Sequence, residues 1–594
     1  MGDDFSSDLD FALGPEAFPS ERDYQLHCLR HSTSHIMASA VRQMFPDARF
    51  GIGPPIRNGF YYDMQLPRPL TPDDLQEIER RMGEISKAGI EFHRENWSKE
   101  KAIEFFGGRA QEFKVELINV IPADVVSTYR IGDFTDLCAG PHVKRTSECK
   151  HFKLTSIAGA YWRGNERNAM LQRIYGTVWP TREELDEHLH NIEEAKRRDH
   201  RKLGRELDLF MMHEWAPGAT FWLPKGTIIY HTLQEKMRRL LGRNGYVEVK
   251  APLLAGSEVF KTSGHWDHYK ENMFVFEGEH EAYALKPMNC PEHMLIFGAK
   301  RRSYRELPLR LAEQSVLHRN ERAGVLAGLT RVRQFQQDDS HIFITEDQIG
   351  EEVERLLGLV ARVYEAFGMS YRFVLSVRDT DTSKYMGDPA LWDNAESLLQ
   401  RVLEANKLEY VVAKGEANFY GPKIDQMIQD SLKREHQLAT IQLDFQLPRR
   451  FGLIYVNEHN AESVPVVVHR AIYGSLERFI GILIEHYAGA FPLWLAPVQA
   501  RVLSISEKTA DYARRVHERL LAEELRVEVD LRDDKIGAKI RDAQLEKVPF
   551  MLVVGAKESE SGSVAVRSRE KGDEGAAPLE DFVARIKREA SFDF

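Results

Sequence analysis

The sequence predicts a multidomain α/β protein in which an α+β domain, a domain built on an antiparallel sheet and a smaller α/β domain follow one another. The chain has 594 residues, whereas a single hydrophobic core rarely grows beyond about 250–300 residues. Residues Ser315–Phe343 contain two strand-like runs around a turn, which indicates a long antiparallel hairpin. Beyond Pro497 strands alternate with helices, which is typical of a compact α/β unit with a mostly parallel sheet.

The composition is that of an ordinary globular protein, with 43% hydrophobic and 29% charged residues. The acidic amino terminus has no basic, apolar signal pattern, and no stretch reaches the ~18 apolar residues that a membrane span needs. Four scattered cysteines exclude a disulfide framework and favour a cytoplasmic location. The net charge of −11 does not exclude a nucleic-acid partner, because binding depends on local basic surface.

The first predicted domain, residues 21–180, follows an acidic tail of residues 1–20. A helix is expected from Asp23 to Phe45, a second, amphipathic helix from Pro72 to Ala88, and a strand over Phe113–Ile121. These elements give the domain its α+β character.

Two pairs of ligand-type residues mark this domain. His31 and His35 are one helical turn apart and share a face, and a later loop carries Cys138 and His142 close to Asp136. Two histidines on a helix with a Cys and a His on a loop form a zinc-type ligand set. Packed or solvated histidines beside an unrelated Cys–His pair would give the same pattern, so both interpretations stand.

A linker is predicted over residues 181–207, within a long charged helix that runs from Thr181 to about Leu209. Its basic run begins at Lys196 and ends at Arg205. Such a run is either the solvated face of a linker helix or a surface for the phosphates of RNA. We give the two interpretations similar weight.

The third segment, residues 208–496, contains the hairpin and is predicted to be the central domain. Arg319, Arg331 and Arg333 are expected on the hairpin arms, with Glu321 close by. Guanidinium groups bind phosphate through bidentate forks, so the hairpin suggests a polyphosphate site. A solvated charged hairpin is the alternative. Near the end of the domain a strand leads into a helix, from whose first turns Arg478 would face back.

Several of these segments resemble class II aminoacyl-tRNA synthetases. The hairpin is similar to motif 2 of that class, the helix and strand that close at Pro252 to motif 1, and Gly474–Arg478 to motif 3. The segments KPMNCP, QFQQDDSHIF and VVVHRA resemble the threonine enzymes in particular. The two His/Cys pairs resemble their editing domain, and residues 497–594 resemble their anticodon-binding domain. No segment resembles the amino-terminal ubiquitin-like (TGS) domain, which implies a form that lacks it.

The resemblance implies a threonine–tRNA ligase. Such an enzyme would activate L-threonine with ATP and Mg²⁺, transfer it to tRNA(Thr), hydrolyse mischarged seryl-tRNA(Thr) and work as a homodimer. Activation needs positioning and charge stabilisation more than covalent help from the protein. The implied catalytic residues are Arg319, Arg478 and Lys423, and the implied ATP-binding residues are Arg319, Glu321, Arg331, Phe335 and Arg478.

The resemblance also implies a Zn²⁺ ion that binds the amino and hydroxyl groups of threonine and so excludes valine. A site that must bond a hydroxyl rejects the analogue without it far better than an apolar pocket does. The implied zinc ligands are Cys290, His341 and His469, and the implied threonine-binding residues are Gln337, Asp339, Tyr420 and Gln442. Serine also has a hydroxyl and would pass this test, which explains a separate hydrolytic site on the same chain.

The implied editing residues are His31, His35, Asp136, Cys138 and His142, which in the threonine enzymes are thought to position water without a metal. The implied anticodon contacts are Arg541, Glu558 and Arg567. Asp533 stands where an Asn is common, which puts its expected base contact in doubt, and Lys547 keeps the charge of the usual Arg but loses its bidentate fork.

Three other functions fit the sequence less well. A stand-alone metallohydrolase would not need motifs 1 to 3. A binding protein derived from a synthetase would typically have lost its phosphate arginines or zinc ligands. A class II enzyme for proline or serine would lack the Cys–His–His set.

Overall fold

The computed structural model describes residues 14–18, 20–165, 167–430 and 434–594. The chain divides into two compact units, one ending at Glu193 and the other beginning at Glu194. Residues 1–13 and 19 of the predicted acidic tail lie outside the described residues. None of the helices in the described ranges combines the length and the apolar character needed to cross a bilayer.

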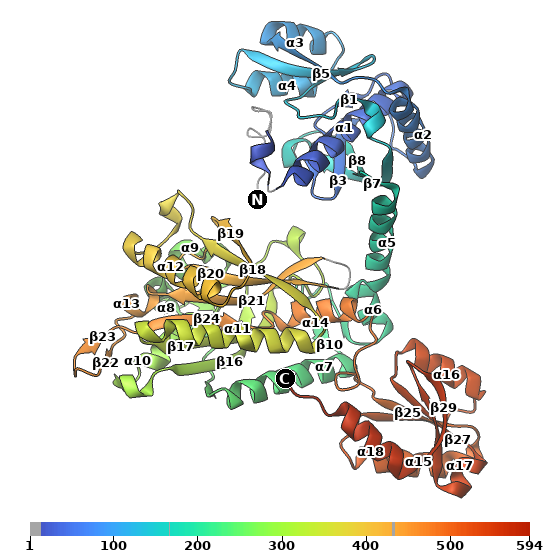
Figure 1. Ribbon diagram of the computed structural model, residues 1–594, viewed down its shortest axis with the longest axis vertical. Coiled ribbons are helices and arrows are strands. Elements are labelled where there is room, and N and C mark those ends of the chain that lie inside the picture. The colour runs from blue at the N-terminus through green and yellow to red at the C-terminus, as the bar shows by residue number, and fades with distance from the viewer. Residues whose placement is uncertain (1–13, 19, 166, 431–433) are drawn as a thin grey trace. The chain divides into compact units, whose positions relative to one another are not determined.

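The amino-terminal unit consists of two helices packed on one sheet, with a smaller sheet-and-helix layer beside it (Figure 1). The helices α1 (Glu21–Met44) and α2 (Pro72–Ala88) lie where the sequence predicted them. The main sheet contains β1 (Arg49–Phe50), β2 (Pro55–Ile56), β3 (Gly59–Gln65), β7 (His151–Tyr161) and β8 (Met170–Trp179). The second layer contains β4 (His93–Ser98), β5 (Val125–Ile131), β6 (Phe134–Leu137), α3 (Lys99–Gly107) and α4 (Glu112–Val120).

Helix α4 corrects the strand predicted over Phe113–Ile121. The buried residues Phe113, Leu117 and Ile118 recur with helical rather than alternating spacing. The same helix buries Lys114, which the strand interpretation left without a role.

The predicted linker helix is divided in two, α5 (Arg182–Arg198) and α6 (His200–Glu206). Asp199 between them caps α6, because its carboxylate accepts a hydrogen bond from the backbone N–H of Arg201 at 2.8 Å. A single helix over this segment was therefore wrong.

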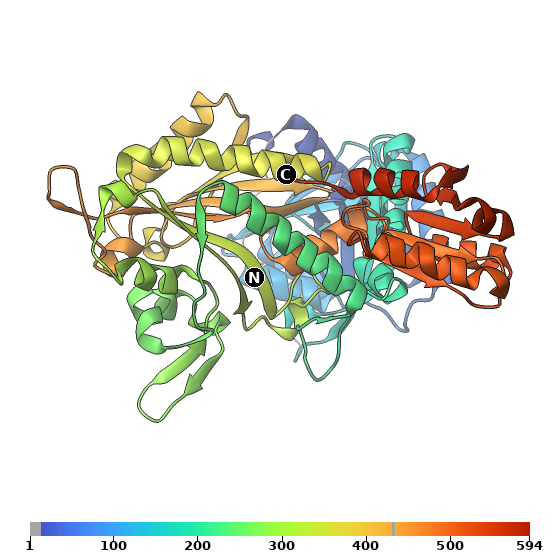
Figure 2. The same cartoon turned by 90° about the horizontal axis from the view of Figure 1, so that it is seen from below.

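The second unit is organised around an eight-stranded sheet (Figures 1 and 2). Its five interior pairs are antiparallel, and the pairs at its two edges are parallel. In spatial order the strands are β11 (Tyr246–Glu248), β16 (Leu309–His318), β17 (Gln334–Ile344), β24 (Val466–Ala471), β21 (Glu435–Asp444), β20 (Lys423–Gln429), β18 (Ser370–Val377) and β19 (Tyr410–Lys414).

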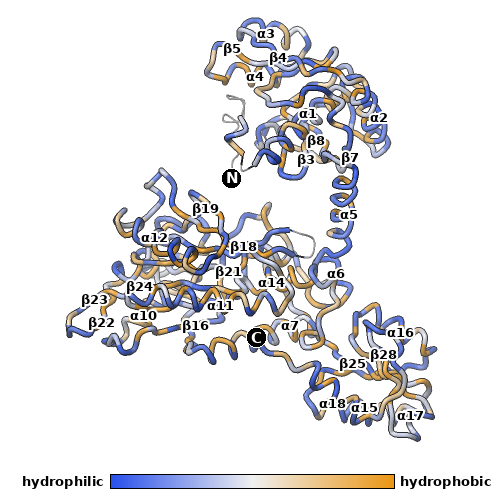
Figure 3. The backbone as a smooth tube through the Cα atoms, in the orientation of Figure 1, coloured by the Kyte–Doolittle hydropathy of each residue, from blue (hydrophilic) through white to orange (hydrophobic). Residues whose placement is uncertain are grey.

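The two faces of this sheet have different environments. One face packs its apolar residues, such as Ile342 and Val468, against four helices, and Figure 3 shows hydrophobic residues along β21, β24 and α14. Those helices are α7 (Pro224–Arg243), α11 (Ile349–Ala366), α12 (Pro389–Ala405) and α14 (Leu476–His486). The other face carries His341 and His469 and packs against α10 (Cys290–Gly298). Alternation along the strands therefore separates the core from the face that holds the candidate site.

The carboxy-terminal segment forms a five-stranded sheet with helices, as predicted, but half of its strand pairs are antiparallel. The sequence prediction missed α17 and β29, and β29 adds an antiparallel edge. The elements are β25 (Ala500–Ser504), α15 (Ala510–Leu521), β26 (Val527–Asp530), α16 (Ile536–Leu545), β27 (Phe550–Val554), α17 (Ala556–Ser561), β28 (Ser563–Ser568), β29 (Gly572–Pro578) and α18 (Leu579–Ala590).

Candidate functional site

Four polar side chains form one row across the central sheet. Lys423 on β20 is paired with Gln442 on β21, Gln442 with His469 on β24, and His469 with His341 on β17. Residues directly opposite one another in an antiparallel ladder point to the same face. Strand register therefore brings together residues that are up to 128 positions apart in sequence.

Cys290 completes a candidate metal centre on this row. It is the first residue of α10 and is buried. The sulfur of Cys290 and one ring nitrogen each of His341 and His469 all lie within 4.8 Å of one another. The two imidazole ring centres are 4.5 Å apart. A Cys–His–His set is a known ligand set for catalytic zinc, which keeps a further position for substrate.

The hydrogen bonds of the two histidines fit a metal at this point. Within the described ranges, His341 Nε2 and His469 Nδ1 are buried and have no hydrogen-bond partner. The other nitrogen of each ring is held, His341 Nδ1 by His293 Nδ1 at 2.8 Å and His469 Nε2 by Asp444 Oδ2 at 2.9 Å. A buried ring nitrogen without a partner, opposite one that is fixed, is what a metal ligand requires.

The predicted threonine-binding residues surround this centre. Tyr420 stacks on His469 with ring centres 4.9 Å apart, and its hydroxyl donates to Gln442 Oε1 at 2.6 Å. Asp339 lies two residues before His341, on the same face of β17, and accepts a hydrogen bond from Asn289 at 3.0 Å. Gln337 is one further step along this face and forms an isolated bridge with Ser475. Asn289, inside the KPMNCP segment, was not singled out from the sequence.

The hairpin differs from its prediction in where its arms end. Its strands are β16 and β17, so Arg319, Arg331 and Arg333 lie on the connecting segment 319–333 and not on the arms. Glycines and a short isolated bridge between Ala327 and Arg331 replace the ladder there. The predicted arginines are therefore loop residues, held by side-chain contacts and by backbone hydrogen bonds such as that from Arg319 N–H to the Arg333 carbonyl at 2.8 Å.

Those contacts tie the loop together. Arg331 bonds Glu321 through two nitrogens, at 2.9 and 3.0 Å, and Arg333 donates to the backbone carbonyl of Glu321 at 2.8 Å. The guanidinium of Arg319 lies over the ring of Phe335, 5.0 Å from its centre. Phe335 itself is buried.

Arg478 joins the loop from α14. It donates to the carbonyl oxygens of Thr330 and Gln437 at 3.0 and 3.3 Å. Burial lowers the pKa of the Arg478 guanidinium, and the nearby positive charges of Arg319 and Arg331 lower it further. The three guanidinium groups are close enough to repel one another, so a polyanion bound between them would relieve that repulsion. Lys423, on the row itself, bonds Asp425 at 2.9 Å.

The amino-terminal unit contains a second candidate centre. His31 and His35 on α1 meet Cys138 and His142, as the sequence predicted for one pocket. Cys138 Sγ lies 3.2 Å from His31 Nε2 and 3.2 Å from His142 Nε2. Burial lowers the pKa values of His31 and His142 and raises that of the Cys138 thiol to about 12. The pocket therefore holds neutral imidazoles and a neutral thiol at physiological pH.

Asp136 lies beside these groups in a buried polar cluster. Its carboxylate is 2.6 Å from Lys114 Nζ and 3.6 Å from His35 Nδ1, and it accepts a hydrogen bond from the Tyr62 hydroxyl. Burial opposes ionisation of Asp136, but the charges of Lys114 and His35 and the hydrogen bonds from Lys114 and Tyr62 together outweigh it and lower the pKa of the carboxyl. Sequence reasoning missed Lys114. Its place beside three apolar residues with helical spacing was the available signal.

The predicted anticodon residues lie on three different elements of the carboxy-terminal segment. Arg541 is exposed on α16, Glu558 accepts a hydrogen bond from Gly555 N–H on α17, and Arg567 on β28 is 3.7 Å from Asp573. Within the described part of the chain, no hydrogen bond or ion pair joins any two of the three. All three lie in one small domain, each on a different element.

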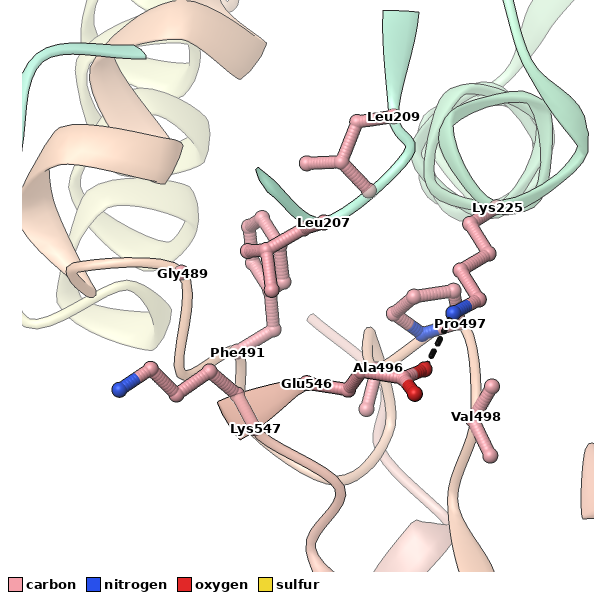
Figure 4. A pocket seen from close by; sticks show the side chains of 10 residues that line it. All are labelled: Leu207, Leu209, Lys225, Gly489, Phe491, Ala496, Pro497, Val498, Glu546 and Lys547. Atoms are coloured by element: carbon pink, nitrogen blue, oxygen red, sulfur yellow. Dashed lines mark hydrogen bonds and ion pairs between the residues drawn. The ribbon is translucent and has the colours of Figure 1, made fainter. Parts of the chain in front are cut away.

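The two departures lie near these elements. Asp533 is exposed before α16. Lys547 has a positive φ of 61° and lines a pocket with Lys225, Glu546 and Phe491, from which its ammonium points away (Figure 4). Lys225 and Glu546 form an ion pair of 2.6 Å across that pocket.

Three parts of the chain match known families. Residues 126–175 match the "Threonyl and Alanyl tRNA synthetase second additional domain", and residues 274–487 match the "tRNA synthetase class II core domain (G, H, P, S and T)". Residues 499–589 match the "Anticodon binding domain". The families follow the order of the predicted domains, and the predicted fold class is confirmed.

Full-length relatives agree with these matches. The threonine–tRNA ligase of Alkalilimnicola ehrlichii is 51% identical over 94% of this chain and 87% of its own length. That of Acetivibrio thermocellus is 49% identical over 96% and 91%, respectively. A solved structure, the RNA-binding domain of threonyl-tRNA synthetase from Cryptosporidium parvum, is 42% identical with a TM-score of 0.64. The matched region comprises 66% of this chain and 98% of the solved chain.

Proposed function

The chain belongs to the family of threonine–tRNA ligases, and from that membership we propose which of its residues carry out each part of the reaction. In the first step a carboxylate oxygen of L-threonine attacks the α-phosphorus of ATP, and pyrophosphate leaves. In the second a ribose hydroxyl of tRNA(Thr) attacks the carbonyl carbon of the adenylate, and AMP leaves. The convergence of Cys290, His341 and His469 on one point is the single observation that carries the threonine assignment.

Arg319, Arg331 and Arg478 bind ATP in this proposal. Arg319 holds the α-phosphate, where negative charge develops, and Arg331 and Arg478 take the distal phosphates together with Mg²⁺. Glu321 accepts a hydrogen bond from the adenine amino group, and the ring of Phe335 stacks on the base. Lys423 lies on the row beside Gln442 and faces the reacting carboxylate and phosphate. Preorganised charges of this kind commonly supply the largest part of such a rate enhancement.

Cys290, His341 and His469 hold Zn²⁺, and their donor set fits it. When bound, the ion supplies Lewis-acid coordination for the amino and hydroxyl groups of threonine. Asp339 and Gln337 receive the ammonium side of the substrate, and Tyr420 and Gln442 close the pocket around its hydroxyl. Bound valine would leave these polar groups without hydrogen-bond partners, which costs binding free energy. An apolar pocket would not discriminate against valine in this way.

The amino-terminal pocket hydrolyses seryl-tRNA(Thr) in this proposal. His31, Cys138 and His142 orient a water molecule, and Asp136 holds His35 in place. Burial lowers the pKa values of the imidazoles and so keeps them neutral, which lets a ring nitrogen accept a hydrogen bond from that water. The basic run of α5 and α6 is a candidate surface for the tRNA, and Arg541, Glu558 and Arg567 are candidates for its anticodon.

The domain boundaries predicted from the sequence, after residues 20, 180, 207 and 496, belong to this proposal. So do a cytoplasmic location and a homodimer that meets through the motif 1 segment.

Threonine-dependent exchange of pyrophosphate into ATP tests the synthetic assignment. The Cys290→Ala variant should lose zinc and most of its exchange activity. A matched control is Cys149→Ala, which removes another buried thiol from the core of the other unit. Undiminished exchange by Cys290→Ala, or exchange driven by proline, would contradict the assignment.

Accumulation of seryl-tRNA(Thr) tests the editing assignment. His31→Ala should release mischarged product while it keeps threonine activation, and the exposed His93→Ala should behave like the original chain. If His31→Ala still clears seryl-tRNA, the amino-terminal pocket is not the editing site.

A further inference from the structure

Behind the candidate zinc site a line of buried polar groups leads away from His341. His341 Nδ1 lies 2.8 Å from His293 Nδ1, and His293 Nε2 lies 3.1 Å from Glu313 Oε2. The other oxygen of Glu313 is 3.2 Å from Lys286 Nζ and accepts a hydrogen bond from the backbone N–H of Ala251 at 2.8 Å. The side chains of Lys286, His293 and Glu313 are at most 1% exposed.

The hydrogen bonds along this line decide which nitrogen of each ring carries a proton. Glu313 is paired with a lysine and is therefore an ionised acceptor, so His293 must donate through Nε2–H. When the His293 ring carries a single proton, on Nε2, its remaining nitrogen, Nδ1, is an acceptor. His341 consequently donates through Nδ1–H, and its lone pair is left on Nε2.

That lone pair lies where the metal is needed. His341 Nε2 is one of the buried nitrogens that have no partner in the described ranges, and the residue His341 belongs to the Cys290–His341–His469 group. The opposite tautomer would place a hydrogen on Nε2 and block coordination. The Asp444 carboxylate bonds His469 directly. The Glu313 carboxylate reaches His341 only through the imidazole of His293.

We propose that Glu313 and His293 are positioning residues that hold His341 in its metal-binding tautomer and so set the zinc affinity of the synthetic site. The inference rests on the zinc role proposed above. Glu313 and His293 are buried and do not touch the candidate metal position. Even so, they contribute a measurable part of the zinc affinity of the site. We call the line Glu313–His293–His341 the relay. Lys286 and the backbone N–H of Ala251 bond Glu313 at its outer end and keep this residue an acceptor.

The sharpest test is Glu313→Gln. Glutamine has the same shape, but its amide can donate to His293 Nε2, which would reverse both tautomers and put hydrogen on His341 Nε2. Zinc affinity, measured by competition with a chromophoric chelator and by zinc content per chain after dialysis, should fall about 10–100-fold. His293→Phe provides a second variant, because it keeps a ring in place and removes both the acceptor for His341 Nδ1–H and the donor to Glu313.

The matched control is Glu352→Gln, which removes the charge of another buried carboxylate, the partner of Arg310 on the same strand as Glu313. Its zinc affinity should equal that of the original chain. Weaker zinc binding by Glu313→Gln and His293→Phe alone would support the relay. Unchanged binding by both variants would overturn the relay and leave the zinc site standing, whereas an original chain that binds no zinc would overturn both.

Discussion

Arg478 donates a hydrogen bond to the backbone carbonyl of Thr330 at 3.0 Å, across 148 positions of the chain. The bond fastens the segment 319–333, which is not part of any strand, to the first turns of α14. One guanidinium therefore both shapes the loop and adds to the charge that Arg319 and Arg331 present. The contact adds to the backbone and side-chain hydrogen bonds that hold the loop.

Replacing Arg478 by lysine should therefore lower activity more than a loss of charge would suggest. Lysine keeps the charge but cannot bond Thr330 and Gln437 together and also bind phosphate. We expect kcat for pyrophosphate exchange to fall about 10²-fold or more. The control Arg372→Lys, in an ion pair with Glu435 at an exposed site, should keep its activity. Equal rates for the two variants would argue against the role of Arg478.

Gly328 should be intolerant of alanine. Its φ is +52°, and an added Cβ would lie 2.3 Å from His200 Nε2, the atom that accepts the Leu329 N–H at 3.0 Å. Gly328→Ala would thus push the segment 319–333 away from the His200 ring. That ring cannot easily move, because its Nδ1 bonds Glu485 Oε1 at 2.6 Å. We expect the KM for ATP to rise about 10-fold, since strain of this kind is worth about 1–3 kcal/mol.

The same loop contains the control for this prediction. A Cβ at Gly324 would meet nothing within 4 Å. Gly324→Ala should leave the KM for ATP unchanged, and similar effects of the two substitutions would mean that general loop flexibility, not the contact with His200, is responsible.

Lys114→Met should abolish editing without affecting threonine activation. The substitution leaves the buried Asp136 carboxylate without its nearest cation, and removing one partner of a buried pair costs about 3–5 kcal/mol. Seryl-tRNA deacylation should fall at least 10²-fold, with pyrophosphate exchange retained because it belongs to the other unit. Lys153→Met, from a solvent-exposed pair with Glu79, should edit normally. Loss of both activities would instead point to misfolding of the whole chain.

Acid should destabilise the amino-terminal unit through His35. Burial, together with the charge of Lys114, lowers the pKa of His35 from 6.5 to about 4 against the opposing effect of Asp136. Because this pKa is depressed in the folded chain, the unfolded chain takes up the proton first as pH falls. Stability should therefore be lost between pH 6.5 and about 4, by up to about 3 kcal/mol.

Urea unfolding of the full chain at pH 7.5 and 5.0 checks this sign. His35→Asn should reduce the difference in unfolding free energy between the two pH values. A variant with the same difference as the original chain would show that other groups cause the pH dependence.

The sequence was informative wherever a local pattern carries the structural signal. Helix α2 was predicted to the residue because Thr71 and Asp74 form a capping box and apolar residues recur with helical spacing. The strand predicted over Phe113–Ile121 was wrong because a short apolar run fits either period. The hairpin was predicted correctly, but its arms were placed too far along, since a loop held by side-chain contacts has no periodicity to read.

By itself the sequence determined which chemical groups are available and which short motifs carry them. One predicted zinc ligand lies in each of the segments KPMNCP, DDSHIF and VVVHRA. The resemblance of these segments to one family was enough to predict the reaction. Only the tertiary structure decided that Cys290, His341 and His469 meet, because cross-strand register depends on contacts between distant segments. It alone placed Lys114 on Asp136 and His293 behind His341. Proximity between distant residues follows from packing, which no local pattern contains.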